Sequence, residues 1–176
     1  MMKKYPIIEP RLMNTRIKLE ENIPLSLFEY FKCFKENKRI VLIVVPSEEK
    51  LNKVYNHYCS TLKSLEIRVV RYNKNQDFKF VSDIIQGYSN TLFIITNSCG
   101  QYIRNIPNLN VIMLFADDIY YSYKKILYIC GAVNMSQDIQ CEAIMVSREV
   151  SEEMDKAKVI TRMFNQSLWE KQYLNY

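Results

Sequence analysis

The sequence predicts an α/β domain of three layers, with a mainly parallel central sheet and helices on both of its faces. Short, continuous apolar runs alternate along the chain with segments of helical periodicity, as in sheets whose strands are buried on both sides. The order strand, turn, helix repeats several times, and such units join parallel strands by right-handed crossovers. About half of the 176 residues are apolar, with only three glycines and five prolines, which excludes disordered and low-complexity classes.

The first segment, residues 1–24, differs from the rest of the chain because Pro6, Pro10 and Pro24 interrupt it. We expect an extended linker or an edge strand there, followed by one domain over residues 25–176. Several cations of this segment could contact phosphates, although we interpret them as the exposed residues of a solvated linker: Arg11, Arg16 and Lys18.

The first half of the domain contains two predicted helix and strand pairs. A helix over Leu25–Asn37 precedes the strand Arg39–Val45, which is rich in β-branched residues and therefore belongs at the centre of the sheet. Ser47 is a candidate helix N-cap, and apolar side chains recur after it at helical spacing. A strand over Leu65–Val70 and a helix over Asp77–Gln86 follow.

The second half contains three further apolar strands. They are predicted at Thr91–Thr96, Val111–Phe115 and Cys141–Val146, with a short helix ending at Gly131 before the last of them. A long amphipathic helix closes the domain, and its N-cap is either Ser147 or Ser151. Ligands of open α/β sheets bind beyond the carboxyl ends of the strands, so we expect functional residues in the loops there.

The composition limits where in the cell we expect the protein and which kinds of chemistry it can carry out. No apolar run reaches the length of about eighteen residues that a membrane helix needs, and residues 1–6 do not look like a secretory signal, so we expect a cytoplasmic protein without a membrane span. The five cysteines are widely spaced and are expected to be buried, reduced thiols. A net charge of +5 is compatible with an anionic partner or with an unspecific basic surface.

The motifs of common nucleotide enzymes are absent from the sequence. A phosphate loop needs glycines spaced before a lysine, and neither that loop nor the glycine pattern of dinucleotide sites occurs. Asp117 and Asp118 follow a predicted strand and are interpreted as structural or capping residues. Tyrosines next to Lys124 and Lys125 could stack bases over a phosphate track, or pack at the rim of the sheet: Tyr120, Tyr121 and Tyr123.

A family resemblance is carried by segments spread along the chain at collinear spacings: Pro6–Arg11, Ile23–Pro24, Val41–Pro46, Leu92–Thr96, Ile106–Val111, Leu114–Asp117, Gly131 and Cys141–Ile144. Over residues 5–165 the sequence resembles the C-terminal RecA-like lobe of superfamily 2 helicases, most closely the ComFA family of late-competence DNA-uptake translocases. The resemblance implies a RecA-like fold and an ATP-dependent DNA helicase or translocase as the parent activity.

The sequence departs from the family where nucleotide phosphates are contacted. The family closes this lobe with Q-x-x-G-R-x-G-R, whereas the same frame here holds Tyr128, Gly131, Ala132, Asn134 and Met135. An earlier motif that ends in arginine and glycine is replaced by Tyr102–Ile103. An arginine finger contributes about a thousandfold or more to phosphoryl transfer. We therefore expect no cofactor on this chain alone, because ATP and Mg²⁺ would require a first lobe with a phosphate loop.

DNA contact is the family property that could remain. The resemblance places it at Ser47, Thr96 and Asn97, where hydroxyl groups and backbone amides would touch the strand without reading its sequence. Our first hypothesis is a degenerate second lobe that binds single-stranded DNA weakly in DNA uptake, or docks onto a phosphate-loop lobe or another competence protein. The alternative is a protein-interaction module without nucleic-acid binding. An independent small-molecule enzyme is a third possibility, for which the sequence offers no convergent polar set.

Overall fold

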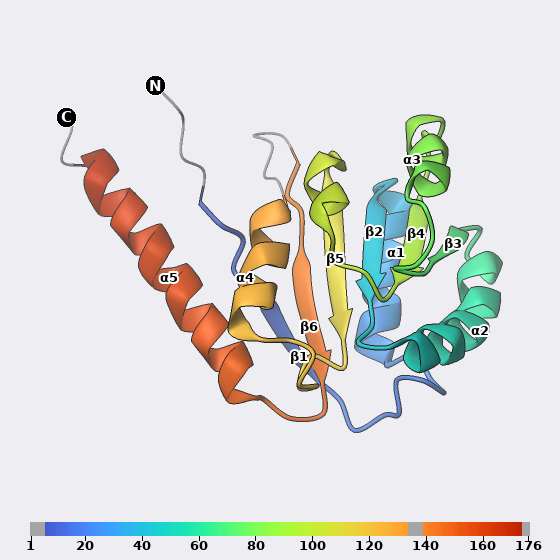
Figure 1. Cartoon of the computed structure of the whole chain (residues 1–176), viewed down its shortest axis with the longest axis horizontal. Coiled ribbons are helices and arrows are strands. Elements are labelled where there is room, and N and C mark those ends of the chain that lie inside the picture. The colour runs from blue at the N-terminus through green and yellow to red at the C-terminus, as the bar shows by residue number, and fades with distance from the viewer. Residues whose placement is uncertain (1–5, 134–138, 174–176) are drawn as a thin grey trace.

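The computed structural model describes residues 6–133 and 139–173, and this part of the chain forms a six-stranded sheet flanked by helices (Figure 1). The strand order is β1-β6-β5-β2-β4-β3, and every neighbouring pair is parallel. The elements are β1 (Arg11–Asn14), α1 (Leu25–Glu36), β2 (Ile40–Val44), α2 (Glu48–Ser64), β3 (Arg68–Tyr72), α3 (Lys79–Gln86), β4 (Leu92–Thr96), the 3-10 helix η1 (Gln101–Asn105), β5 (Leu109–Leu114), α4 (Tyr123–Ala132), β6 (Ala143–Ser147) and α5 (Glu152–Tyr173).

Two hydrophobic cores lie on opposite faces of the sheet, because side chains alternate along each strand. In β2, Val41 and Ile43 face the core that α1 and α2 cover. Leu42 and Val44 face the core that α3, η1, α4 and α5 cover. The predicted three-layer α/β class with helices on both faces of a parallel sheet is therefore confirmed.

The strand β2 lies at the centre of the sheet, as its composition predicted. It pairs with β4 on one side and with β5 on the other, and Val44 is in register with both Thr96 and Met113. Its residues Val41–Val44 are completely buried. A continuous apolar sequence is the expected result of such burial, since neither face of the strand meets water.

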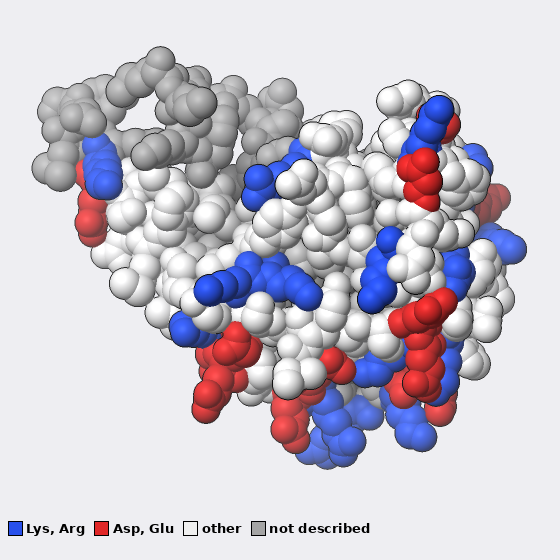
Figure 2. Space-filling model, viewed as in Figure 1, with Lys and Arg blue, Asp and Glu red and all other residues white. Residues whose placement is uncertain are grey.

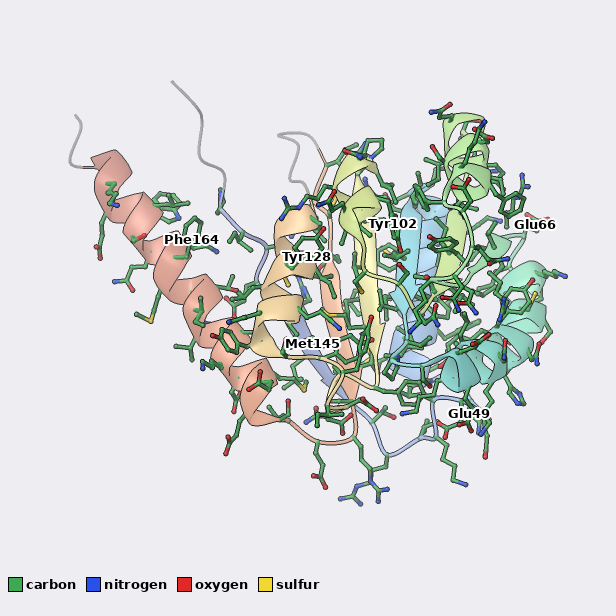
Figure 3. The ribbon with its side chains drawn as sticks, in the orientation of Figure 1. Glu49, Glu66, Tyr102, Tyr128, Met145 and Phe164 are labelled. Atoms are coloured by element: carbon green, nitrogen blue, oxygen red, sulfur yellow. The ribbon has the colours of Figure 1, made fainter. Side chains whose placement is uncertain are left out.

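The prediction for the third strand was wrong by several residues at its start. Helix α2 continues to Ser64, and Glu66 then adopts a left-handed backbone with φ of 58° before β3 begins at Arg68. The Lys35 ammonium group fixes this turn by donating to the Leu65 carbonyl at 2.7 Å and pairing with Glu66 at 3.1 Å (Figure 3). This long-range contact is invisible to local periodicity.

The N-terminal segment contains an edge strand, one of the two forms expected for it. β1 pairs with β6, and the ladder continues where Thr15 N–H donates to the Ser147 carbonyl at 2.9 Å. Before β1, the side-chain amide of Asn165 on α5 donates to the Ile7 carbonyl at 2.7 Å and accepts from the Ile7 N–H at 2.9 Å. The chain ahead of β1 is thus fastened to the last helix.

Two further expectations are decided by the structure. Ser151, and not Ser147, caps α5, because its hydroxyl accepts from the Met154 N–H at 3.2 Å while Ser147 belongs to β6. All five cysteines are free thiols, but only Cys130 and Cys141 are buried, since Cys59 and Cys99 are half-buried and Cys33 is exposed on α1. None of the described helices combines the length and the apolar character needed to cross a membrane.

Candidate functional site

The parallel strands end at one edge of the sheet, the lower edge in Figure 1, and this carboxyl edge gathers the residues predicted to be functional. Ser47 follows β2, Thr96 ends β4 and Asn97 follows it, and Lys124 and Lys125 lie in the first turn of α4 beyond β5. Residues far apart in sequence therefore meet at the position where open α/β sheets bind ligands.

Ser47 is an exposed N-cap with an extended backbone, as predicted. Its hydroxyl accepts from the Lys50 N–H at 3.2 Å and so satisfies one free donor of α2. Glu48 and Glu49 follow directly, and the Glu49 carboxylate accepts from Lys53 at 2.7 Å, which lowers the pKa of Glu49 (Figure 3). These carboxylates occupy the positive end of the helix and repel a phosphate there.

Thr96 and Asn97 are buried, with exposed fractions of 0% and 4%. The Thr96 hydroxyl accepts from the Ser98 N–H at 3.0 Å, and the Asn97 side-chain carbonyl accepts from the Lys74 N–H at 2.9 Å. The Asn97 backbone carbonyl accepts from the Tyr120 hydroxyl at 3.3 Å. These groups therefore tie the loops after β3, β4 and β5 to one another.

Lys125 lies over the ring of Tyr120, with its ammonium nitrogen 3.4 Å from the ring centroid, while Lys124 is exposed. Tyr120 packs edge-to-face against Tyr121 at 5.0 Å and donates to the Cys99 sulfur at 3.9 Å. Burial raises the pKa of Cys99 to about 11, although Tyr120 and Lys125 act in the opposite direction. The thiol is therefore protonated at neutral pH.

Asp117 and Asp118 are structural residues, as the sequence indicated. Asp117 accepts from the Glu149 N–H at 3.1 Å, which joins the loops after β5 and β6. Asp118 accepts from the Tyr120 N–H at 2.9 Å and pairs with Lys50 at 3.3 Å. Within residues 6–133 and 139–173, no three His, Cys, Asp or Glu side chains come together in a way that could hold a metal ion.

Tyr102, at the first degenerate motif position, is part of an aromatic cluster. Its ring stacks on Phe78 at 4.1 Å and meets Tyr72 edge-to-face at 5.5 Å. The hydroxyl donates to the Ser98 carbonyl at 2.7 Å, and burial raises the pKa of Tyr102. The position that the resemblance aligns with a family arginine thus holds a packed aromatic ring.

The described part of the second segment that resembles a family motif lies on α4, where Figure 3 labels Tyr128. The Arg104 guanidinium lies 4.6 Å from the Tyr128 ring centroid, so this arginine, two residues after Tyr102 in the sequence, is a ring partner of Tyr128. Gly131 is exposed with open space beside it, and Ala132 is buried. Met135 and Asn134 lie outside the described residues.

Sequence reasoning missed an open pocket of about 370 Å³ at the same edge. Its lining joins the chain after β1 to side chains from the loops after β5 and β6 and from α2: Thr15, Arg16, Ile17, Lys18, Leu19, Glu20, Lys50, Phe115, Asp117 and Arg148. The cations of the first segment were noted in the sequence, but nothing in the sequence linked them to Arg148. Figure 2 shows side chains of both charges along this lower edge.

Comparison with known proteins gives similarity in structure only. No family profile and no curated protein matches the sequence. Among 53 similar chains of solved structures, the C-terminal part of the Fun30 ATPase domain has a TM-score of 0.47 at 11% identity, over 83% of this chain and 53% of that one. A chain of a pre-nicking CRISPR RNA-guided surveillance complex has a TM-score of 0.53 at 13% identity, over 92% of this chain and 23% of that one.

At such low identity the similarity shows the fold alone, and the present chain spans about half and about a quarter of these two proteins. The six parallel strands between two layers of helices agree with it. The chain therefore has a RecA-like α/β fold.

Proposed function

We propose that this chain is a degenerate second RecA-like lobe, related to the ComFA DNA translocases, that cannot hydrolyse ATP alone. It contributes weak, sequence-independent binding of single-stranded DNA in DNA uptake. One observation carries the proposal: the sheet is complete and parallel, yet Tyr102 and Tyr128 fill the motif positions with packed rings.

ATP turnover would need groups that stabilise the charge of the transferred phosphate. At the described motif positions the side chains are uncharged, and the nearby Arg104 is stacked on Tyr128. In this proposal a separate phosphate-loop lobe binds ATP and Mg²⁺, and the present chain docks onto that lobe or onto another competence protein in the cytoplasm.

The surface proposed to contact DNA consists of Ser47, Lys124 and Lys125, with buried Thr96 and Asn97 holding the loops beneath it. The Ser47 hydroxyl and the Lys124 ammonium group are exposed, and the ring of Tyr120 lies beside Lys125. Hydroxyls and ammonium groups position a strand through its phosphates without reading bases. Binding is weak because Glu48 and Glu49 stand exposed next to Ser47.

Fluorescence anisotropy with a labelled thymidine oligonucleotide tests this surface. We expect binding at low salt that falls steeply as salt rises, because counterions are released from the strand. Lys124→Glu combined with Lys125→Glu should weaken binding about tenfold or more, since it reverses two charges. Lys38→Glu combined with Lys63→Glu is the matched control, because it reverses two exposed charges outside the proposed surface, and it should bind more tightly than the first double variant.

The absence of binding at low salt would contradict the proposed DNA contact. ATP hydrolysis by the purified chain would contradict the proposal that the lobe is degenerate. The former result would favour the second candidate, a protein-interaction module on the same scaffold. Exposed apolar side chains on α5 favour that candidate: Val159, Met163 and Phe164 are 52%, 64% and 39% exposed, and Figure 3 shows Phe164 on this helix.

A further inference from the structure

The pocket after β1 and β6, here called the strand-end pocket, has an excess of positive charge. Four of its side chains are cationic, Arg16, Lys18, Lys50 and Arg148, and two are anionic, Glu20 and Asp117. The volume of about 370 Å³ lies within the range of small-ligand sites. The pocket therefore suits an anion larger than a monatomic ion.

Two of the cations are arginines that neighbouring strands bring together. Asn14 and Ser147 are in register, and Thr15 N–H donates to the Ser147 carbonyl, so Arg16 and Arg148 leave adjacent strand ends. Neither guanidinium pairs with a carboxylate of the described residues. Their donors are thus available to a ligand, and a planar guanidinium can bind a phosphate through two donors at once.

The position of the pocket in the topology supports ligand binding. The helix after β2 covers one face of the sheet and the helix after β5 covers the other, so the strand order along the sheet reverses between these adjacent parallel strands. Open α/β sheets bind ligands at the crevice formed by such a change. Lys50 spans it, with its ammonium nitrogen 3.3 Å from Asp118 and 4.1 Å from the ring centroid of Phe115.

Phe115 has a left-handed backbone, with φ of 57°. A bulky aromatic residue rarely adopts this conformation, because its Cβ crowds the backbone there. The surrounding structure holds it there: Ala116 N–H donates to the Val146 carbonyl at 3.0 Å, and Asp118 N–H donates back to the Phe115 carbonyl at 2.9 Å. The sharp turn directs the chain across the floor of the strand-end pocket.

We propose that the strand-end pocket binds a phosphate group, held chiefly by Arg16 and Arg148, with Lys18 and Lys50 adding positive charge. A phosphate monoester carries close to two negative charges and three acceptor oxygens, which matches two guanidinium groups better than a carboxylate does. The phosphate belongs either to a nucleotide or to a nucleic-acid strand. The site is distinct from the Lys124 and Lys125 surface and does not depend on the proposed function.

Isothermal titration calorimetry at low salt tests the pocket with three probes: inorganic pyrophosphate, adenosine diphosphate and a short thymidine strand. Arg16→Gln and Arg148→Gln change exposed side chains, so the fold should persist. Each should weaken binding about tenfold, the effect of losing one charge-assisted contact. Arg68→Gln removes the same charge at the opposite, amino end of β3 and should leave the affinity unchanged.

The probes also identify the source of the phosphate. Arginine-dependent binding of pyrophosphate and the diphosphate supports a nucleotide, whereas arginine-dependent binding of the strand alone supports a nucleic acid. If no probe binds, or if both arginine variants retain binding, the proposal that the strand-end pocket binds phosphate is wrong. A third outcome separates the two proposals: the thymidine strand binds through Lys124 and Lys125 but needs neither arginine, and pyrophosphate does not bind. This outcome contradicts phosphate binding in the strand-end pocket and agrees with the proposed function.

Discussion

Replacing Tyr121 with phenylalanine removes a single hydroxyl from the junction between β2 and β5. Tyr121 is 1% exposed, and its hydroxyl donates to the Val44 carbonyl at 2.9 Å. The hydrogen bond connects the loop that precedes α4 with the central strand β2. It therefore crosses the junction of β2 and β5 beside the strand-end pocket. The ring itself remains buried in the variant, so the substitution tests the polar contact and not the packing.

The expected cost follows from the burial of both partners. Losing a buried hydrogen bond and leaving the Val44 carbonyl without this donor costs about 1–2 kcal/mol. For a chain of this length, each kcal/mol lowers the melting temperature by about 2–4 °C, so a decrease of roughly 2–8 °C is expected. Tyr123→Phe is the matched control, because Tyr123 is only half-buried and no described hydrogen bond involves its hydroxyl.

Equilibrium unfolding in guanidinium chloride measures both variants. Tyr121→Phe should move the midpoint to lower denaturant without changing the slope, since the surface exposed on unfolding stays the same. Tyr123→Phe should unfold within about 0.5 kcal/mol of the parent protein, as most surface substitutions do. Equal midpoints for the two variants would refute the reasoning, because the contact to Val44 would then contribute nothing.

Two further predictions concern α5 and a buried thiol. Asn165→Ala should cost about 1–2 kcal/mol and speed proteolysis ahead of β1, because both hydrogen bonds to Ile7 are lost, whereas Gln166→Ala on the exposed side should change neither rate nor midpoint. Burial raises the pKa of Cys130 from 9.0 to about 12, so the folded state holds this proton more tightly and stability falls as pH rises from 9 towards 12. Unfolding curves at several alkaline pH values should show a loss that is shallower in Cys130→Ala, by up to about 1.4 kcal/mol per pH unit.

The local sequence was sufficient to predict most helices and strands, because the residues of each element are buried in a regular pattern. The run Arg39–Val45 predicted the central strand, since a strand covered on both faces needs apolar side chains at every position. The α2 N-cap at Ser47 was predictable because capping depends on neighbours three residues away. The start of β3 was not, because Lys35 fixes the turn at Glu66 from a distant helix.

The sequence predicted at which edge of the sheet the candidate residues lie, but not which of them are buried. The loops after parallel strands had to meet at one edge, so Ser47, Asn97 and Lys125 were expected near one another. Burial of Thr96 and Asn97 depends on Lys74 and Tyr120 from other loops, which no local pattern reveals.

The sequence by itself determined the layered fold, because alternation of apolar runs with amphipathic helices leaves few other ways to bury the apolar surface. It also showed that the segments which resemble the family's phosphate-contacting motifs hold no arginine at the matching positions, which is a matter of residue identity. Only the tertiary structure decided which polar groups are free. Strand order joins Arg16 to Arg148 across 132 residues and packs Arg104 against Tyr128, and such pairing depends on the register and twist of the sheet rather than on neighbours in the chain.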